Sequence, residues 1–356
     1  MSEKVILLGP LPPPYGGVAI YMSALREFVR GRGVRTWSYP YQERKEPDTD
    51  YFKHKRLGIV PLLIRDGFKA RILDASHFHI EYPNPILVTL WTALKPLLRF
   101  DWVKVIHDGS LPSRYDNFGP ARRSIFRLAV RSVTEFIVVN EDLNLWLRNK
   151  VKVKQKISVI RSLLPIPPGA FDAASTPLPT EIDGAIEGFR KRVCSIGVFI
   201  PDYGFRDIAD GLEKIRRDTG ENIGLILIDG AFICDENYRS EVLQQRDWIT
   251  VVSNVAHPEV LRILKKSDVF VRGFRFESYG LSRVEAIWCG LPVVATDVGE
   301  TRGMLLYDYG DEEELIRQIK EALFNPPVQQ TQTWAEQFQR EAQENLRALM
   351  KTLGLN

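Results

Sequence analysis

Two kinds of apolar pattern alternate along the chain. Short continuous apolar runs are typical of buried β-strands, and longer stretches in which apolar residues recur every three or four positions are typical of helices. The pattern predicts strands over residues 4–9, 102–107, 135–140, 156–160, 192–200, 223–229, 249–255 and 268–273. It predicts helices over residues 18–33, 205–217, 257–266 and 331–353. Buried strands that alternate with helices indicate parallel sheets, and here the arrangement occurs twice.

A segment rich in proline and small residues, 161–180, separates the two sets of predicted elements. We therefore expect an N-terminal domain over residues 1–165 and a second domain over residues 166–328. A polar helical segment, 329–356, follows them. The length of 356 residues is sufficient for two such domains, each with its own core.

The composition, 44% hydrophobic and 26% charged, is that of a globular protein. The longest apolar stretch, 86–94, is far shorter than the roughly 20 residues of a membrane-spanning helix. The apolar run at the start is too short for a signal peptide. Three cysteines without metal-binding or CxxC spacing indicate buried thiols in a reducing compartment. We therefore expect a cytoplasmic location.

Positive charge is concentrated in the first half. Residues 1–168 contain 27 lysines and arginines against 15 acids, whereas the remainder contains 21 against 30. The excess of positive charge in residues 1–168 favours an anionic partner for this half of the chain. Basic residues gather in the runs 53–56, 65–73 and 121–131, in the last two among apolar residues. These runs are either solvated helix faces or a patch for an anionic membrane surface. Nucleic acid is less favoured, because no recognised binding module accompanies the charge.

The loops that leave the strands are the informative ones, because ligands bind beyond the carboxyl ends of parallel strands. The first loop contains Gly16 and Gly17, where the backbone can approach a ligand closely. The helix that follows directs its positive end toward an anion. The loop has neither the Walker nor the GxGxxG motif, and a rigid connecting turn is the alternative interpretation.

A second loop lies in the stretch VRGFRFESYGLSRVEAIWCGLPVVATDVG, residues 271–299. Glu277 and Glu285 lie on either side of a turn that contains Gly280. Two interpretations are open for these acids, ligand binding or helix capping. Ser282 and Glu285 have the spacing of a capping box, and a carboxylate at Glu277 would also lie near free helix amides.

The two glutamates, followed by EAIWCGLPVVATDVG, resemble the donor-site signature of retaining glycosyltransferase family 4, among the group 1 glycosyltransferases. Further similar segments occur in the family's order: GPLPPPYGGVAIYMSAL, VIHDGS, KISVIRSLLP, SIGVFIPDYGF and AHPEVLRILKKSDVFV. The resemblance implies the GT-B fold, an α/β fold of two Rossmann-like parallel-sheet domains facing across a cleft. It also implies that the last helix crosses back to the N-terminal, acceptor-side domain, while the second domain binds the nucleotide-sugar.

Carried over to this chain, the resemblance implies that Glu277 and His107 are catalytic. Glu277 would hold hydroxyls of the transferred sugar, and His107 would lie near the reacting sugar and the acceptor. A histidine that merely satisfies its own hydrogen bonds at a loop start is the alternative for His107. Glu285 would accept hydrogen bonds from the donor's ribose hydroxyls. The other implied donor-binding residues are Gly16, Gly17, Ser278, Tyr279, Gly280 and Leu281, whose backbones would face the diphosphate.

The sequence departs from the family at Val198 and Tyr203, where an arginine and a lysine usually neutralise the leaving diphosphate. We expect Arg275 or Arg272, in the signature loop, to bind the anion instead. Arg275 is the stronger candidate, because it lies two residues before Glu277 and would project to the same side of an extended loop.

The predicted function is therefore a retaining glycosyltransferase that moves a sugar from a nucleotide-sugar donor to an acceptor hydroxyl. A glycan or lipid-linked acceptor in bacterial polysaccharide or glycolipid assembly is expected, with peripheral association of the basic domain with the inner face of the membrane. One alternative is a non-catalytic GT-B-like partner protein with a degraded donor site, which Glu300 favours because a glycine is common at its position. Another enzyme on the same fold, such as a sugar-nucleotide epimerase, is a further alternative.

No cofactor or metal is expected. His77, His79 and Glu81 alternate along the sequence, so on a strand they would share one face, as metal ligands do. The ends of apolar strands often carry such residues, and the family resemblance requires no metal ion.

Overall fold

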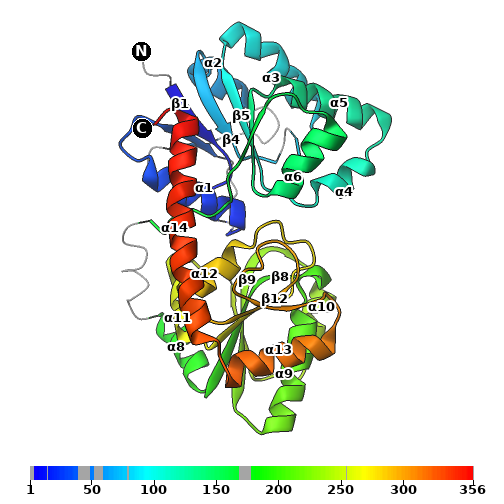
Figure 1. The fold of residues 1–356 in the computed structure, drawn as a ribbon, viewed down its shortest axis with the longest axis vertical. Coiled ribbons are helices and arrows are strands. Elements are labelled where there is room, and N and C mark those ends of the chain that lie inside the picture. Colours follow the sequence, from blue (N-terminus) through cyan, green and yellow to red (C-terminus); the bar gives the residue numbers. More distant parts are fainter. Residues whose placement is uncertain are drawn as a thin grey trace. The chain divides into compact units, whose positions relative to one another are not determined.

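The computed structural model describes residues 4–13, 15–38, 49–51, 59–77, 80–167, 178–253 and 255–355. The chain divides into two compact units (Figure 1). Unit 1 comprises Met1–Pro13, Val18–Pro165 and Gln343–Asn356, and unit 2 comprises Pro14–Gly17 and Ile166–Ala342. His79 and the basic run 53–56, both singled out from the sequence, lie outside the described residues.

Unit 1 is built on a seven-stranded sheet in which every neighbouring pair is parallel. In spatial order the strands are β3 (Thr49–Tyr51), β2 (Arg35–Ser38), β1 (Lys4–Leu8), β4 (Ala70–Asp74), β5 (Asp101–Ile106), β6 (Glu135–Val138) and β7 (Lys156–Val159). The chain moves outward from β1 to β2 and β3, then returns to β4 on the other side of β1. This reversal is the topological switch point beside which parallel sheets bind ligands.

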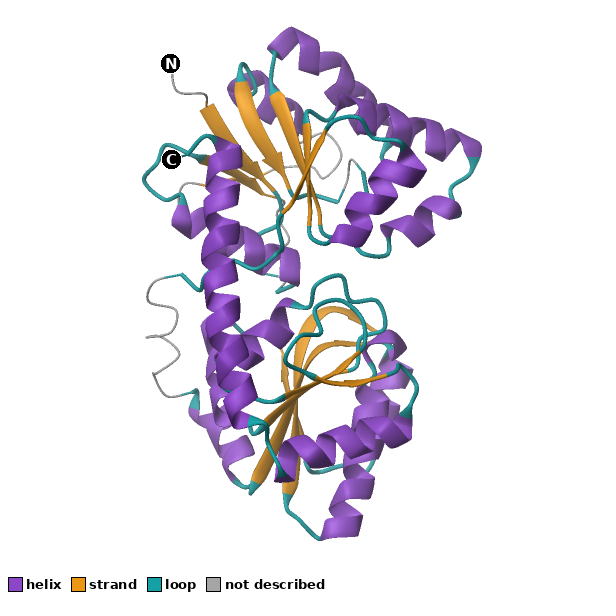
Figure 2. Ribbon diagram, in the orientation of Figure 1, coloured by secondary structure: helices purple, strands orange, loops and turns teal. Residues whose placement is uncertain are grey.

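Helices cover both faces of this sheet (Figure 2). They are α1 (Gly17–Phe28), α2 (Ile59–Asp66), α3 (Pro85–Leu98), α4 (Leu111–Asp116), α5 (Pro120–Ser132) and α6 (Glu141–Trp146), with a π-helical turn at Leu147–Val151. Successive residues of β1 point to opposite faces, as in any strand. Ile6 packs in one core with Trp102, and Val5 packs in a second core with Met22 of α1.

Unit 2 is built on a six-stranded sheet, again parallel throughout. Its strands in spatial order are β10 (Ile249–Ser253), β9 (Ile223–Cys234), β8 (Lys191–Phe199), β11 (Val269–Arg272), β12 (Val293–Thr296) and β13 (Leu305–Tyr307). Its helices are α8 (Thr180–Glu187), α9 (Phe205–Thr219), α10 (Glu236–Leu243), α11 (His257–Lys266), α12 (Leu281–Trp288) and α13 (Glu312–Phe324), with a 3-10 turn at Pro201–Tyr203. Leu212 of α9 and Ile319 of α13 share one core with Val193 and Val269 of the sheet.

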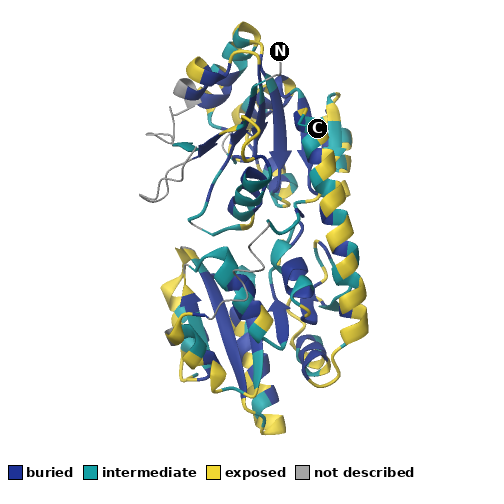
Figure 3. Cartoon of the chain, turned by 90° about the vertical axis from the view of Figure 1, so that its left-hand side faces the viewer, coloured by how far each residue is buried: buried dark blue, intermediate teal, exposed yellow. Residues whose placement is uncertain are grey.

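The last helix, α14 (Val328–Leu353), takes part in both units. Leu349 and Leu353 belong to the core of unit 1 that contains α1. In unit 2, the guanidinium of Arg302 lies over the rings of Trp334 and Phe338, 5.4 Å and 5.2 Å from their centroids. Exposed residues run along the other side of the helix (Figure 3). No helix in the described part of the chain is long and apolar enough to span a membrane.

The predicted fold class, two α/β domains on parallel sheets, is confirmed. The helix predicted over residues 257–266 is α11 with those bounds, but the helix predicted over 18–33 is too long. It ends at Phe28, because Gly31 and Gly33 adopt positive φ angles and turn the chain into β2. The basic run 65–73 is not one helix face. The chain turns after α2, with Lys69 at a φ of 50°, and continues as the central strand β4.

Gly303 packs tightly beneath α14 and provides a stability test. Its φ is +76°, and a Cβ there would lie 2.4 Å from Cδ1 of Trp334. Gly310 has a similar φ of +89°, but a Cβ there would meet no atom within 4 Å. We expect Gly310→Ala to lower the free energy of unfolding by about 1–2 kcal/mol, and Gly303→Ala to lower it by a further 1–3 kcal/mol or so. Urea unfolding measures both, and equal losses would contradict the packing of α14 on this loop.

Candidate functional site

The loops that leave β8, β11 and β12 meet at the carboxyl-terminal edge of the unit 2 sheet. These strands are neighbours, so their loops emerge side by side. The backbone N–H of Arg275, after β11, donates to the carbonyl of Asp202, after β8, at 3.0 Å. The N–H of Glu300, after β12, donates to the carbonyl of Tyr279 at 2.9 Å. These bonds join the three loops into one surface.

A buried ion pair lies at the centre of this surface. Nε of Arg272 donates to Oε2 of Glu277 at 2.9 Å, and each side chain is 10% exposed. Arg272 also donates to the carbonyl of Ile196. Its guanidinium lies 4.9 Å and 5.0 Å from the ring centroids of Tyr203 and Phe274, which stack on each other at 4.3 Å. Arg272 is therefore held on several sides, and it holds Glu277 in turn.

A second buried cation, Arg283, holds the loop after β12. Its Nη1 donates to the carbonyls of Thr296 and Val298 at 3.2 Å and 2.5 Å, and its Nη2 donates to the hydroxyl of Thr296 at 2.8 Å. Burial lowers the pKa of Arg283 to about 10, so it remains a cation near neutral pH. Burial alone would raise the pKa of Glu277, but the charges of Arg272 and Arg283 outweigh it and hold that pKa below 4.5.

Helix α12 begins beside this ion pair without a side-chain cap. Its N-cap residue is Gly280, with a φ of +87°. A Cβ at this position would approach Cδ of Arg283 at 2.9 Å and Cγ of Glu277 at 3.0 Å, so the close approach requires glycine. The capping box that Ser282 and Glu285 would form is absent, because the helix begins one residue before Ser282. The first amides of α12 and two buried arginines make this edge positive.

Glu285 lies on the second turn of α12 and pairs with a histidine of the neighbouring helix. Nε2 of His257, the first residue of α11, lies 2.7 Å from Oε1 of Glu285. Burial would lower the pKa of His257, but the charge of Glu285 outweighs it and raises the pKa. His257 was not predicted from the sequence. The signal was its place at the start of a helix, where the macrodipole disfavours a cation unless an acid lies nearby.

Glu300 is held in a separate ion network. Its two carboxylate oxygens accept hydrogen bonds from Arg302 at 2.8 Å and 2.7 Å. Arg302 also donates two hydrogen bonds to Glu341 of α14, at 2.7 Å and 2.8 Å. The charge of Glu300 is therefore compensated, although a glycine was expected at this position.

The extended loop that would place Arg275 on the same side as Glu277 is not present. The chain turns at Arg275 and Phe276, so Arg275 and Glu277 do not project from one extended strand. Arg275 is exposed and lies over the rings of Phe276 and Tyr309, at 5.1 Å and 5.4 Å. Arg272 is instead the arginine in contact with Glu277, and it also lies against Tyr203, one of the two positions where the family's cations are missing.

The other predicted residues of this loop precede or begin α12. Ser278 is half-buried, and Tyr279 is buried. Leu281 is the first residue of the helix. Val198 is buried in β8. Their positions at the carboxyl ends of β8 and β11 are compatible with a ligand at this edge.

The remaining predicted site residues lie in other loops. Gly17 begins α1, and a Cβ at Gly16 or Gly17 would meet no atom within 4 Å. His107 directly follows β5 and is buried, with Nδ1 2.9 Å from the hydroxyl of Ser162 and its ring against Tyr21. Its Nε2 has no hydrogen-bond partner among the described residues. Burial, together with the nearby His77 and Lys104, lowers the pKa of His107 to about 3, so the imidazole is neutral.

The alternation of His77 and Glu81 does not place them on a strand. The described residues on either side of the pair 78–79 form a turn, in which the N–H of Tyr82 donates to the carbonyl of His77. Glu81 is fully buried, and its carboxylate lies 3.2 Å from Nζ of Lys104. This ammonium group occupies the position beside the carboxylate where a metal ion would bind. Within the described residues, no group of three or more metal-ligating side chains is present.

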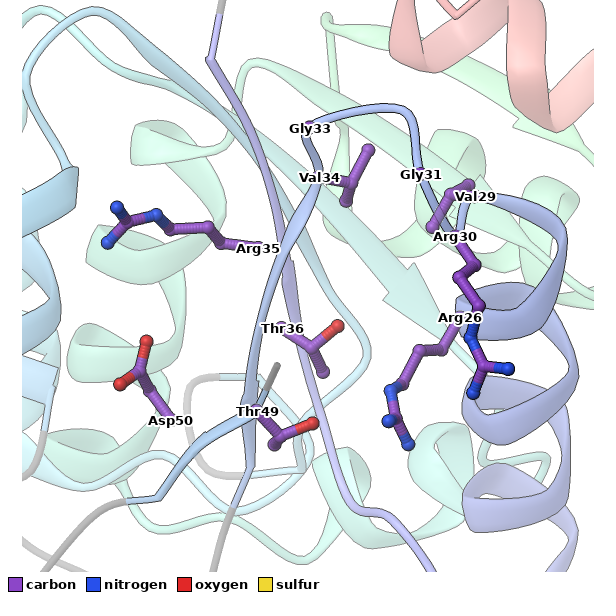
Figure 4. A pocket seen from close by; sticks show the side chains of 10 residues that line it. All are labelled: Arg26, Val29, Arg30, Gly31, Gly33, Val34, Arg35, Thr36, Thr49 and Asp50. Atoms are coloured by element: carbon purple, nitrogen blue, oxygen red, sulfur yellow. The ribbon is translucent and has the colours of Figure 1, made fainter. Parts of the chain in front are cut away.

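A hollow of about 750 Å³ lies elsewhere in unit 1 (Figure 4). It is formed by the end of α1 and the first residues of β2 and β3, and three arginines line it, Arg26, Arg30 and Arg35. Arg30 pairs with Glu27, and Arg35 pairs with Asp66. The hollow contains none of the predicted site residues. The loops at the carboxyl ends of the strands carry the predicted site residues, so we assign the candidate site there and not to this hollow.

Two units that each contain a parallel sheet covered by helices have the architecture called GT-B, which the structural neighbours share. A family model described as glycosyl transferases group 1 matches residues 183–340, which lie within unit 2. The fold is thus GT-B, and the matched part of unit 2 is similar to group 1 glycosyltransferases. No curated protein matches the chain.

Several solved structures resemble the whole chain. Sucrose-phosphate synthase from Thermosynechococcus elongatus has 17% identity and a TM-score of 0.66, over 99% of this chain and 96% of that one. HepE of Anabaena in complex with UDP and glucose has 17% identity and a TM-score of 0.71, over 99% of both chains. The UDP-forming α,α-trehalose-phosphate synthase of Burkholderia vietnamiensis has 12% identity and a TM-score of 0.67, over 99% of this chain and 98% of that one. At these identities the likeness establishes the fold.

The Arg272–Glu277 pair makes a prediction about stability. Arg272→Ala leaves the buried carboxylate of Glu277 without its partner, and we expect the free energy of unfolding near neutral pH to fall by about 3–5 kcal/mol. Arg275→Ala, which removes an exposed arginine from the same loop, is the matched control and should change it by about 0.5 kcal/mol or less.

The same pair predicts a pH dependence. Because the folded pKa of Glu277 is depressed, its ionic contribution to stability is present above about pH 4.5 and is lost as the pH falls through the folded pKa. The difference between wild type and Arg272→Ala should therefore narrow as the pH falls. Urea unfolding at several pH values measures it, and a difference that does not vary with pH contradicts the ion pair.

Proposed function

We propose that the protein is a retaining glycosyltransferase of the family 4 type, which transfers a sugar from a nucleotide-sugar to an acceptor hydroxyl. The proposal extends to an acceptor that is a glycan or a lipid-linked glycan in polysaccharide or glycolipid assembly. UDP and UDP-glucose, named in the titles of the HepE structures, make a uridine diphosphate sugar the first donor to test.

One observation carries this proposal. Glu277 and Glu285 lie on either side of the uncapped start of α12, each is buried, and each is held by a cation, Arg272 or His257. This arrangement lies within the segment that matches the glycosyltransferase family model. Side chains that served only to stabilise the loop would not require an uncapped helix N-terminus between the two carboxylates.

In the proposed site, the diphosphate lies at the N-terminus of α12, in contact with the backbone from Ser278 to Leu281. A helix N-terminus supplies only about half an elementary charge. Arg272 and Arg283 together with the single charge of Glu277 leave one net positive charge beside it. Arg272 thus takes the role that Val198 and Tyr203 cannot fill. The proposed mechanism uses no metal ion or other cofactor.

The proposed reaction breaks the bond between the anomeric carbon and the diphosphate oxygen, and a bond forms from the acceptor oxygen to the same face of that carbon. The proton of the acceptor hydroxyl goes to the departing diphosphate oxygen. Glu277 accepts hydrogen bonds from hydroxyls of the transferred sugar, and its depressed pKa keeps it ionised for this role. His107 is the proposed catalytic residue of unit 1; its imidazole is neutral, and its Nε2 has no hydrogen-bond partner among the described residues.

The alternative function, a non-catalytic partner protein, rested on two departures from the family pattern. Each departure is compensated by a nearby cation: Arg272 lies against Tyr203, and Arg302 neutralises the charge of Glu300. An epimerase on the same fold would convert a nucleotide-sugar into its epimer and would release no nucleoside diphosphate, so analysis of the products separates it from a transferase.

The proposed function is tested by ligand stabilisation followed by turnover. Wild type should be stabilised against heat by UDP, or by another nucleoside diphosphate in a panel, and should release that diphosphate from the matching nucleotide-sugar. Glu277→Gln still offers an oxygen to Arg272, so we expect it to fold and to bind UDP within about threefold of wild type. Its turnover should fall by about 100-fold or more, because the charge that contacts the sugar is lost.

Arg275→Ala is the control and should retain most of the turnover. If no nucleoside diphosphate or nucleotide-sugar stabilises the wild-type protein, the non-catalytic alternative is correct. If Glu277→Gln retains full turnover, the protein is an enzyme, but the site has been assigned wrongly.

We also propose that unit 1 binds an anionic membrane surface. Exposed cations gather at the amino-terminal ends of β4 to β7, at Lys69, Arg99, Arg131, Lys152 and Lys154. Large apolar side chains are exposed at the same edge: Ile64 is 73% exposed, Phe68 60% and Leu97 71%. The N–H of Lys69 donates to the carbonyl of Leu98, so these loops are adjacent. Cations around exposed apolar side chains suit an anionic bilayer.

Sedimentation with lipid vesicles tests this surface. Wild type should bind vesicles that contain phosphatidylglycerol and should bind vesicles of phosphatidylcholine alone much less. Lys69→Glu with Arg99→Glu should lower binding by at least about tenfold, since each cation near the surface contributes about 1 kcal/mol. Lys214→Glu with Arg217→Glu, on exposed positions of α9, is the control of equal charge change. Equal losses in the two double variants would indicate attraction by net charge alone and would contradict a patch on unit 1.

A further inference from the structure

His257 contacts Glu285 from outside the signature loop. The residue begins α11, and Glu285 lies on α12, which packs beside α11. The distance of 2.7 Å between Nε2 of His257 and Oε1 of Glu285 is that of a strong, charge-assisted hydrogen bond. The Glu285 side chain is only 7% exposed, and that of His257 is 18% exposed. The pair is thus largely removed from solvent, where such a bond constrains both side chains.

A charged imidazole at the position of His257 would destabilise the helix unless an acid lies nearby. A cation at the first position of a helix meets the positive end of the macrodipole. The amide of Ala256, the residue before it, is already satisfied by the side chain of Glu259 at 2.8 Å, so capping of α11 does not require the histidine. Among the described residues, the ring of His257 makes its hydrogen bond with Glu285. The histidine is therefore placed to fix the orientation of that carboxylate.

The contact leaves part of the carboxylate available. His257 engages Oε1 of Glu285, and in the described part of the chain no side chain or backbone group donates to Oε2. A carboxylate has about four acceptor sites, of which this contact uses one. A vicinal pair of hydroxyl groups matches such a carboxylate, because both hydroxyls can donate to it at once.

We propose that His257 is a positioning residue for ribose recognition, which holds Glu285 so that its remaining acceptor sites face the 2′ and 3′ hydroxyls of the donor nucleotide. The inference rests on the proposed function, because it assumes that a nucleoside diphosphate binds at the start of α12. It adds a residue that the two-glutamate signature does not include. Without the imidazole, the carboxylate of Glu285 is free to rotate. The protein then loses its preference for a ribose that carries both hydroxyls, while its affinity for the diphosphate changes little.

The test compares the dissociation constants of UDP and of 2′,3′-dideoxy-UDP, which lacks both hydroxyls. Wild type should bind UDP about tenfold or more tightly than the dideoxy compound, the scale of a hydrogen bond to a charged group. His257→Ala should lose about tenfold in affinity for UDP and less than about twofold for the dideoxy compound. His257→Gln can donate from its amide to Oε1 and should recover most of the preference. Glu285→Ala should lose the preference, and the double variant with His257→Ala should be no worse than Glu285→Ala.

Glu259→Ala is the matched control. It removes the cap of α11 without removing the contact with Glu285, so it lowers stability while the ratio of the two dissociation constants stays at the wild-type value. If His257→Ala does not fold, the ratio of the two dissociation constants in His257→Gln and Glu259→Ala, compared with wild type, still tests the proposal.

Equal losses for the two nucleotides in His257→Ala would mean that the histidine acts only on the fold, and this overturns the proposal. An unchanged ratio in both His257→Ala and Glu285→Ala overturns it as well, although UDP binding would leave the proposed function standing. Wild-type protein that binds neither nucleotide, nor any other nucleoside diphosphate, contradicts the proposed function itself and the inference with it.

Discussion

Every strand in both described sheets runs parallel to its neighbours, and the site depends on that constraint. A parallel pair requires a crossover connection, so helices cover the faces of the sheet and all loops that follow strands emerge at one edge. Arg272, Glu277 and Glu300 are near one another because β11 and β12 are neighbours in the sheet. The same topology in unit 1 places His107 at the carboxyl end of β5, beside the end of β4. Residues far apart in the sequence thereby come to share one edge.

Charges buried at that edge are the second determinant. Arg272 and Arg283 lie in an environment where an unpaired cation would be very costly, and each is surrounded by acceptors: a carboxylate, a hydroxyl or backbone carbonyls. The network holds the three loops in place and leaves the edge positive. Stability and the proposed ligand binding therefore depend on the same side chains. A carboxylate on a loop usually contributes little to the fold, but Glu277 contributes because its partner is buried with it.

The last helix connects this network to the rest of the molecule. Arg302 joins Glu300, on the loop after β12, to Glu341 of α14, and it also lies over Trp334 and Phe338. The same helix ends in the core of unit 1 through Leu349 and Leu353. A glycine at residue 300 would remove one of the two carboxylates that Arg302 joins. The glutamate at that position is thus explained by α14, independently of any ligand.

The sequence by itself determined the fold class, because apolar periodicity depends on local geometry and is visible residue by residue. It also singled out Glu277, Glu285 and Gly280 as candidate site residues through their spacing around one turn. Only the tertiary structure decided which side chains these residues contact. Arg272 holds Glu277, whereas Arg275 lies over Phe276 and Tyr309, because the loop turns at Arg275 and Phe276. His257 reaches Glu285 across two helices, and no sequence spacing encodes that distance. Helix and strand propensities act over a few residues, whereas these contacts depend on how the sheet brings separate loops together.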